Sequence, residues 1–291
     1  MSFVRSLGVA CLLLGIVDTA HAETLLERGA YLVRSIAACG NCHTPKGEKG
    51  EEPAGMELAG GLVIDEKPFT AVMPNITPDR ETGIGGWTDA EILRAIREGV
   101  RPDGSIIGPP MPVEFYRGIS DRDGAAIVAY LRSLPPVRNQ VAKSVYRMPL
   151  PPSWGPPVGK VEAPATSYMA AADKVAYGAY LAGPLGHCLE CHTPRLPDGR
   201  RDMSARAGAG GMPINGPAGP VVPPNLTPDR ATGLGAWTDA EIRRAITQGV
   251  HRDGRSLMPP MAFAYYARMS DGDLDAIIAY LRALKPIRKD P

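Results

Sequence analysis

The feature that most constrains the fold of this chain is a tandem repeat. The segment NITPDRETGIGGWTDAEILRAIREGV, which begins at Asn75, returns as NLTPDRATGLGAWTDAEIRRAITQGV, which begins at Asn225. The closing stretch AAIVAYLRSL of the first half likewise corresponds to DAIIAYLRAL in the second half. A solenoid repeats every ~20 to 50 residues, and this period is much longer. The repeat therefore predicts two copies of one domain.

The repeat divides the chain into four segments. We predict a signal peptide at 1–22, a first domain at 23–140, a proline-rich linker at 141–167 and a second domain at 168–291. The signal prediction rests on Arg5, the apolar run that follows it, and the small-x-small pattern of Ala20 and Ala22. Cys11 leaves a lipoprotein signal as an alternative. We expect a periplasmic protein with no transmembrane segment in the mature chain, and peripheral association with the inner membrane remains open.

Composition excludes one class of partner and favours a cofactor. Lys and Arg number 32 and Asp and Glu number 31, whereas a nucleic-acid-binding protein needs a basic surface. Aromatic residues make up only 6% of the chain, while Gly and Pro number 33 and 30. Such a chain has little material for an apolar core. A large apolar cofactor would supply what is missing.

Three helices are predicted in each copy, and no segment shows a convincing alternating strand pattern, so we expect an all-α fold. The first helix leads into a cysteine motif. Its apolar face is expected to contain Leu25, Leu26, Tyr31 and Leu32 in the first copy, and Val175, Tyr177, Tyr180 and Leu181 in the second. The third helix is expected to begin at Ser120 or Ser270 and to stop before Pro135 or Pro286.

Local signals define the second helix closely. Thr88 as N-cap and Glu91 three residues later form a capping box, and Trp87 with Ile92 forms a hydrophobic staple across the same turn. Gly99 stands where a left-handed residue would end the helix. The second copy repeats these features with Trp237, Thr238, Glu241, Ile242 and Gly249.

The two C-x-x-C-H motifs contain every cysteine that follows the signal segment. They consist of Cys39, Cys42 and His43 in the first copy and Cys188, Cys191 and His192 in the second. This spacing is the attachment signature of c-type haem, in which two thiols bond to the porphyrin edge and the histidine ligates iron. A thioredoxin-like redox pair would need a βαβ setting, and a zinc site joining both motifs would leave the histidines without a role. Two motifs predict two covalently bound haems.

The repeat also selects the second axial ligand of each iron, for which methionine is usual in cytochromes c. Met111 and Met261 occupy matched positions, each within a PPM triplet. The alternative is that both methionines only fill apolar gaps. Met258 faces Gly108 in the alignment of the copies and remains a rival within the second copy. His251, like His187 unassigned, is an alternative ligand at the second iron or a surface residue.

Taken together, these motifs resemble those of dihaem cytochromes c with class I domains, and in particular the c-type cytochrome subunits of periplasmic alcohol, gluconate and related dehydrogenases. The resemblance is carried by both C-x-x-C-H-T-P motifs, NITPD and NLTPD, GIGGWTDAEI and GLGAWTDAEI, the PPM triplets, and AYLRSL and AYLRAL. It covers nearly the whole chain after residue 22. Those subunits typically carry three haems, whereas this chain has two motifs.

The resemblance implies two tandem class I cytochrome c domains, each wrapping one covalent haem, joined by a proline-rich linker. The first and third helices would cross near Gly29 and Tyr31 in one copy, and near Gly178 and Tyr180 in the other. Trp87 and Trp237 would donate to haem propionates if they are not only staple residues. Arg80 and Arg230 are propionate partners by charge or solvated loop residues.

The function implied is transfer of single electrons from a periplasmic or membrane-associated dehydrogenase to a terminal oxidase or another cytochrome. No catalytic residue is predicted. The alternative is a dihaem redox enzyme, such as a peroxidase or a thiosulfate-oxidising cytochrome. A peroxidase needs an iron with an open coordination position, and in the thiosulfate enzymes a cysteine ligates the active haem. All four cysteines that follow the predicted signal segment belong to attachment motifs, which favours the electron carrier.

Overall fold

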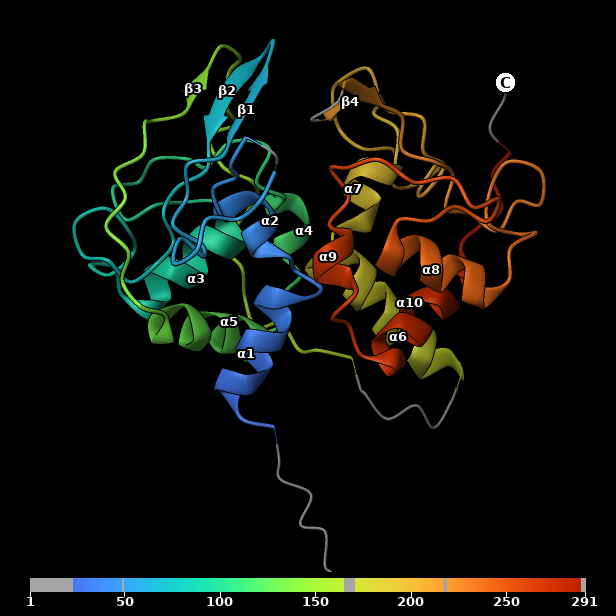
Figure 1. Ribbon diagram of the computed structural model, residues 1–291, viewed down its shortest axis with the longest axis horizontal. Coiled ribbons are helices and arrows are strands. Elements are labelled where there is room, and N and C mark those ends of the chain that lie inside the picture. The colour runs from blue at the N-terminus through green and yellow to red at the C-terminus, as the bar shows by residue number, and fades with distance from the viewer. Residues whose placement is uncertain (1–22, 49, 165–170, 217–218, 289–291) are drawn as a thin grey trace, which may run out of the picture.

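The computed structural model describes residues 23–48, 50–164, 171–216 and 219–288. The predicted signal peptide and Cys11 lie outside the described residues. Two helical halves stand side by side, the first drawn in blue to green and the second in yellow to red (Figure 1). Each half has the same order of α-helices, with a short cysteine-bearing helix between its first and second long helices. The second half adds a short π-helix after its first helix. The two-copy organisation that the repeat predicts is therefore present in the structure.

The described residues of the first half form five helices and most of one small sheet. Its elements are α1 (Leu25–Arg34), α2 (Cys39–His43), β1 (Val63–Glu66), β2 (Phe69–Val72), α3 (Asp89–Glu98), α4 (Val113–Tyr116) and α5 (Asp121–Ser133). The connecting segment adds β3 (Val145–Tyr146). The second half contains α6 (Ala171–Tyr180), η1 (Leu181–Leu185), α7 (Cys188–His192), β4 (Ile214–Gly216), β5 (Gly219–Val221), α8 (Asp239–Gln248), α9 (Phe263–Tyr266) and α10 (Asp271–Ala283).

The strands correct the expectation of an all-α fold. β1, β2 and β3 form an antiparallel sheet in that order, and β4 pairs with β5 in a second antiparallel sheet. The longest of these strands has four residues. An alternating pattern needs about four to eight residues to be recognised in a sequence, so strands this short give no usable signal.

The helix ends follow the predicted signals. Thr88 accepts from the backbone N–H of Glu91 while the Glu91 carboxylate accepts from the backbone of Thr88, and Thr238 with Glu241 does the same. Gly99 adopts a left-handed conformation with φ 66°, as a C-terminal stop requires. The third helices begin at the predicted caps, Ser120 and Ser270.

The apolar face predicted for α1 is only partly correct. Leu32 is fully buried, but Leu25 and Leu26 are each 47% exposed. The residues of α1 that are buried are Gly29, Leu32 and Val33, which share one face at helical spacing. Leu25 and Leu26 lie in the first turn, at the exposed end of the helix (Figure 1).

Glycine allows the first and third helices to cross closely in each half. α1 packs on α5, and α6 packs on α10. A Cβ atom built on Gly29 would lie 1.9 Å from the carbonyl oxygen of Ala126, and one on Gly178 would lie 1.9 Å from that of Ala276. Backbone carbonyls within a helix cannot withdraw as a flexible side chain can. The crossing at Gly29 and Gly178 that the resemblance implies is present.

Substitution Gly29→Ala should separate α1 from α5 because the added methyl group would overlap a helix backbone. We expect the free energy of unfolding to fall by about 3 kcal/mol or more. Urea denaturation of the matured protein would measure the change. Gly86→Ala is the matched control, since the nearest atom to a Cβ at Gly86 is 3.8 Å away. Equal stability losses in both variants would contradict the close-crossing argument.

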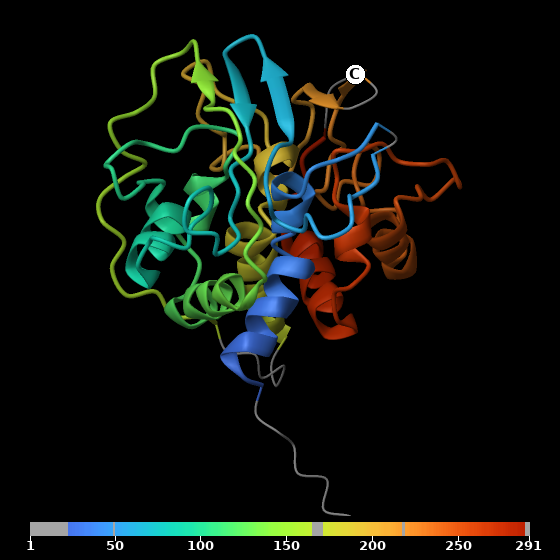
Figure 2. The same cartoon turned by 60° about the vertical axis from the view of Figure 1, so that its left-hand side comes forward.

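Two tyrosines join the halves by a reciprocal exchange of hydrogen bonds. Tyr31 of α1 donates to Asp273 at 2.6 Å and accepts from the backbone N–H of Ser270 at 3.0 Å, both at the start of α10. Tyr180 of α6 donates to Asp123 at 2.8 Å and accepts from Ser120 at 3.1 Å, at the start of α5. Figure 2 shows α1 and α2 at the boundary with the red helices of the second half. Each first helix therefore contacts the third helix of the other half.

Removing both tyrosine hydroxyls should weaken this exchange. In the double variant Tyr31→Phe/Tyr180→Phe, two buried carboxylates each lose a donor, at a cost of about 1–3 kcal/mol per site. The midpoint of urea unfolding should therefore move to lower concentration. Tyr146→Phe is the control, because the Tyr146 hydroxyl donates to the Pro109 carbonyl at 3.1 Å, outside the exchange. A double variant as stable as this control would show that the exchange contributes nothing.

The proline-rich segment packs on the first half. The Trp154 indole donates to the carbonyl of Ile107 at 2.8 Å, and the backbone N–H of Val158 donates to Glu98 at 2.9 Å. Residues 165–167 of the predicted linker lie outside the described ranges. In the part of the chain that the structure describes, no helix has the length and apolar character needed to cross a bilayer.

Candidate functional site

The cysteine motif of the first half forms a single short helix, α2. Ala38 precedes it in a left-handed conformation, φ 47° and ψ 38°, and so turns the chain sharply after α1. Cys39 and Cys42 stand three positions apart, so their thiols lie on neighbouring positions of one helix face. His43 ends the helix and is only 8% exposed.

The second half repeats this arrangement on α7. His187 takes the left-handed position, with φ 38° and ψ 33°, ahead of Cys188. Cys191 follows one turn later, and His192 is 9% exposed. Both halves therefore present two thiols and one buried imidazole from one short helix.

A backbone carbonyl fixes the imidazole in each half. Nδ1 of His43 donates to the Pro74 carbonyl at 2.9 Å, and Nδ1 of His192 donates to the Pro224 carbonyl at 2.8 Å. Burial lowers the pKa of both histidines, which favours the neutral form that ligates metals. Nε2 is then the nitrogen available to a metal, and the carbonyl sets the orientation of the ring.

The sequence analysis missed these two prolines, although a signal for them exists. Pro74 and Pro224 immediately precede the repeated Asn75 and Asn225. Asn75 donates to the Val137 carbonyl at 2.7 Å, and Asn225 makes the same contact with Ile287. The repeated N-x-T-P motif thereby ties the loop with the proline carbonyl to the chain that follows the third helix.

The four thiols are unbridged, and burial raises the pKa of each. The raised values are about 12 for Cys39, about 11 for Cys42, about 11 for Cys188 and about 12 for Cys191. Within the described ranges, no group of three or more His, Cys, Asp or Glu side chains is placed to share a metal ion. The donor set in each half is thus two protonated thiols and one neutral imidazole with Nδ1 engaged. This set fits a covalently attached haem.

The two predicted methionine ligands have matched surroundings. Met111 and Met261 are both partly buried and pack against the apolar core, as do Cys39 and Cys188. Met258, the rival in the second half, is 50% exposed. Burial therefore favours Met261 over Met258.

The other residues singled out in the sequence have different surroundings. Trp87 and Trp237 are partly buried, and the carbonyls of these tryptophans accept from Arg132 and Arg282 of the third helices. Arg80 is exposed, as is its counterpart Arg230.

His251 already has partners. Its ring lies edge-on to the Trp237 ring, with 4.6 Å between centroids, and its Nδ1 lies 2.8 Å from the Asp253 carboxylate. The structure thus engages the His251 ring with Trp237, which precedes α8, and with Asp253 of its own loop.

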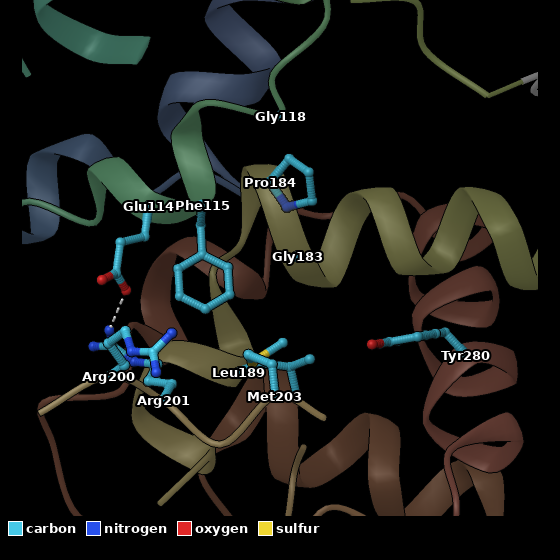
Figure 3. A pocket seen from close by; sticks show the side chains of 10 residues that line it. All are labelled: Glu114, Phe115, Gly118, Gly183, Pro184, Leu189, Arg200, Arg201, Met203 and Tyr280. Carbon is cyan, nitrogen blue, oxygen red and sulfur yellow. Dashed lines mark hydrogen bonds and ion pairs between the residues drawn. The ribbon is translucent and has the colours of Figure 1, made fainter. Parts of the chain in front are cut away.

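The two cysteine helices meet the opposite half at the boundary between the copies. The Asn41 amide of α2 donates to the Pro260 carbonyl at 3.2 Å. Near α7, Arg201 donates both to Glu190 of that helix at 3.0 Å and to Glu114 of α4 in the first half at 2.7 Å. A cavity of about 500 Å³ opens beside this ion pair, lined by Phe115 of the first half and by Leu189 and other residues of the second (Figure 3).

Two buried tyrosines at matched positions, Tyr116 and Tyr266, lie close to the cysteines of both copies. Burial raises the pKa of Tyr266, and Cys188, Cys191 and Cys42 lie near enough to its hydroxyl to act on it electrostatically. Tyr116 lies edge-on to His187 of the second half, 5.7 Å between ring centroids. The two attachment motifs therefore approach each other across the boundary.

Comparison with known proteins gives a consistent result for both halves. The family model for cytochrome c matches residues 26–135 and again residues 175–285. The chain is 32% identical over 280 residues to the gluconate 2-dehydrogenase cytochrome c subunit of Pantoea cypripedii, covering 92% of this chain and 62% of that protein.

Two further relatives are similar to this chain over most of its length. Identity is 33% over 288 residues with the cytochrome c subunit of the quinone-type alcohol dehydrogenase of Gluconobacter oxydans, covering 92% of this chain and 57% of that subunit. It is 34% over 256 residues with a dihaem c-type cytochrome of Cereibacter sphaeroides, covering 86% of this chain and 82% of that protein. The chain thus spans less than two thirds of the length of the two dehydrogenase subunits.

Proposed function

Because this chain belongs to the cytochrome c family, we propose that it is a periplasmic dihaem electron carrier that accepts single electrons from a dehydrogenase. The observation that carries the proposal is the duplicated donor set. Each half holds two partly buried thiols and a buried imidazole oriented by a proline carbonyl, with a partly buried methionine at a matched position.

Each residue of the set has a defined task toward its haem. Cys39 and Cys42 would bond to the porphyrin edge in the first copy, and Cys188 and Cys191 in the second. His43 and His192 would ligate iron through Nε2, while the Pro74 and Pro224 carbonyls hold the rings in place. Met111 and Met261 would supply the second axial ligand, and thioether ligation raises the potential. Bound in this way, haem iron supplies reversible one-electron exchange.

The names of the relatives support the choice of partner. They include cytochrome subunits of gluconate, alcohol and fructose dehydrogenases. We propose a periplasmic or membrane-associated dehydrogenase as electron donor, and an oxidase or another cytochrome as acceptor. The closeness of the two attachment motifs would let electrons pass between the haems inside one chain.

A redox titration with a carbon monoxide challenge tests the proposal. We expect both haems of the matured protein to show the weak long-wavelength band of methionine-to-ferric-haem charge transfer. The reduced protein should not bind carbon monoxide, because one histidine and one methionine would ligate each iron and leave no open position. If one haem lacks the band and binds carbon monoxide, its iron is open. That result would favour a dihaem enzyme, with peroxide or a small oxidisable anion as the substrate to test.

A further inference from the structure

The two attachment motifs differ in one charged residue. The residue immediately before the second cysteine is Asn41 in the first copy and Glu190 in the second. Asn41 is neutral and donates to the Pro260 carbonyl. Glu190 is a carboxylate whose side chain is only 17% exposed. The copies therefore carry different charges within motifs whose cysteines and histidine match.

Glu190 is held by partners on both of its sides. Its Oε1 accepts from Nη2 of Arg201 at 3.0 Å, and its Oε2 lies 3.3 Å from Nδ1 of His187. Arg201 also donates from Nε to the Glu190 backbone carbonyl at 2.7 Å. Two contacts hold the carboxylate and a third holds the backbone of the same residue, beside Cys188 and Cys191 of the motif.

Arg201 connects the pair to the first copy. Its side chain is 8% exposed, and Nη1 donates to the Glu114 carboxylate at 2.7 Å. Its guanidinium lies over the Phe115 ring, 5.6 Å from the ring centroid. Figure 3 shows Glu114, Phe115 and Arg201 together at one end of the cavity. A charge held in this way at the boundary is poorly screened by salt.

Glu190 lies within the second attachment motif and is linked to the first copy. It stands between Cys188 and Cys191 in the sequence, and Arg201 joins its carboxylate to that of Glu114 in α4. Tyr116, which ends α4, lies edge-on to His187, whose Nδ1 contacts the same Glu190 carboxylate. The carboxylate of Glu190 therefore lies at the second attachment motif and beside the first copy.

We propose that Glu190 and Arg201, here called the seam ion pair, tune the reduction potentials of the haems attached at this boundary. The proposal rests on the proposed function and deepens it. A nearby negative charge stabilises ferric iron and lowers the potential, while a nearby positive charge stabilises ferrous iron and raises it. Glu190 belongs to the second motif, so the effect should be larger at that haem. The seam ion pair would then help to set the order in which the haems are reduced.

Single neutralisations of the pair provide the test, because their effects have opposite signs. Glu190→Gln should raise the potential, and Arg201→Gln should lower it, most strongly at the second haem. Spectroelectrochemical titration of the matured protein would measure both. We expect about a tenfold change in the ratio of ferric to ferrous iron at a fixed potential, which is ~59 mV for one electron. The double variant should return close to the starting potential.

Opposite signs separate electrostatic tuning from a structural role, since a loosened boundary would shift both single variants in the same direction. Shifts of equal sign, or none, would overturn the proposal. If Arg201→Gln does not fold, the comparison of Glu190→Gln with the charge-preserving Glu190→Asp decides alone. Glu57→Gln is the control, because Glu57 forms an ion pair with Arg34 in which both side chains are well exposed.

Failure of the tuning proposal is distinguishable from failure of the proposed function. If the starting protein carries two haems that titrate reversibly and the variants do not move as expected, only the tuning is wrong. If the starting protein lacks two reversible haems, the electron-carrier function itself is wrong. Asn41→Asp provides an independent check, since a new carboxylate in the first motif should lower the potential of the first haem.

Discussion

Simultaneous replacement of Cys39 and Cys42 by alanine is expected to remove covalent haem from the first copy and to leave the second haem in place. Each haem would be attached through the two thiols of a single short helix, and the structure leaves all four thiols unbridged. Covalently bound haem per protein should therefore fall by about half. The pyridine haemochrome assay and the mass of the denatured protein would measure it.

Two comparisons make this result specific. Cys188→Ala/Cys191→Ala should give the same loss, and the remaining haem should differ spectroscopically because it belongs to the other copy. Cys11→Ala is the control, since Cys11 lies in the predicted signal segment. Unchanged haem content in both double variants would contradict the attachment sites. A zinc site would instead appear as loss of bound zinc in metal analysis.

Replacement of Met111 by leucine should lower the potential of the first haem and open its iron to carbon monoxide. Leucine has a similar volume to methionine but no sulfur, so the apolar packing is largely kept while the ligand is lost. Axial ligands span a potential range of ~0.8 V, and we expect a decrease of about 0.1 V or more. Met261→Leu should do the same at the second haem. Redox titration and carbon monoxide difference spectra would measure both effects.

Met258→Leu is the control for this pair of variants. Met258 is half exposed and has no counterpart in the first copy. The Met258→Leu variant should leave the reduction potentials of both haems and the binding of carbon monoxide unchanged. If Met258→Leu opens the second iron and Met261→Leu does not, the ligand assignment in that copy is reversed. Unchanged carbon monoxide reactivity in all three variants would show that methionine ligates neither iron.

The parts of the fold that sequence predicted well are those encoded locally. The capping box of Thr88 and Glu91 and the stop at Gly99 act within one or two helical turns, so neighbouring residues reveal them. The third helices likewise begin at Ser120 and Ser270 because a serine side chain caps the third residue that follows. Because both copies contain the same capping and stop residues, a prediction made for one copy applied equally to the other.

The parts that sequence did not predict depend on distant partners. Tyr31 was expected on the apolar face of its own helix, yet its hydroxyl bonds to Asp273, 242 positions away. β3 forms only because the connecting segment returns to β2. In the site, the cysteine motifs were evident from spacing alone. The carbonyl of Pro74 was not, because a backbone acceptor has no side chain to mark it.

The reciprocal exchange of Tyr31 and Tyr180 has the form of an isologous contact between two subunits. In such contacts the same surface is used on both sides, as in a twofold-symmetric dimer. Here the two partners are successive copies within one polypeptide, and each copy uses the tyrosine of its first helix and the start of its third helix. A contact of this kind closes on itself, because each copy satisfies the other. The chain behaves in this respect as a dimer fused into one molecule, whose stoichiometry is fixed at synthesis and does not depend on concentration.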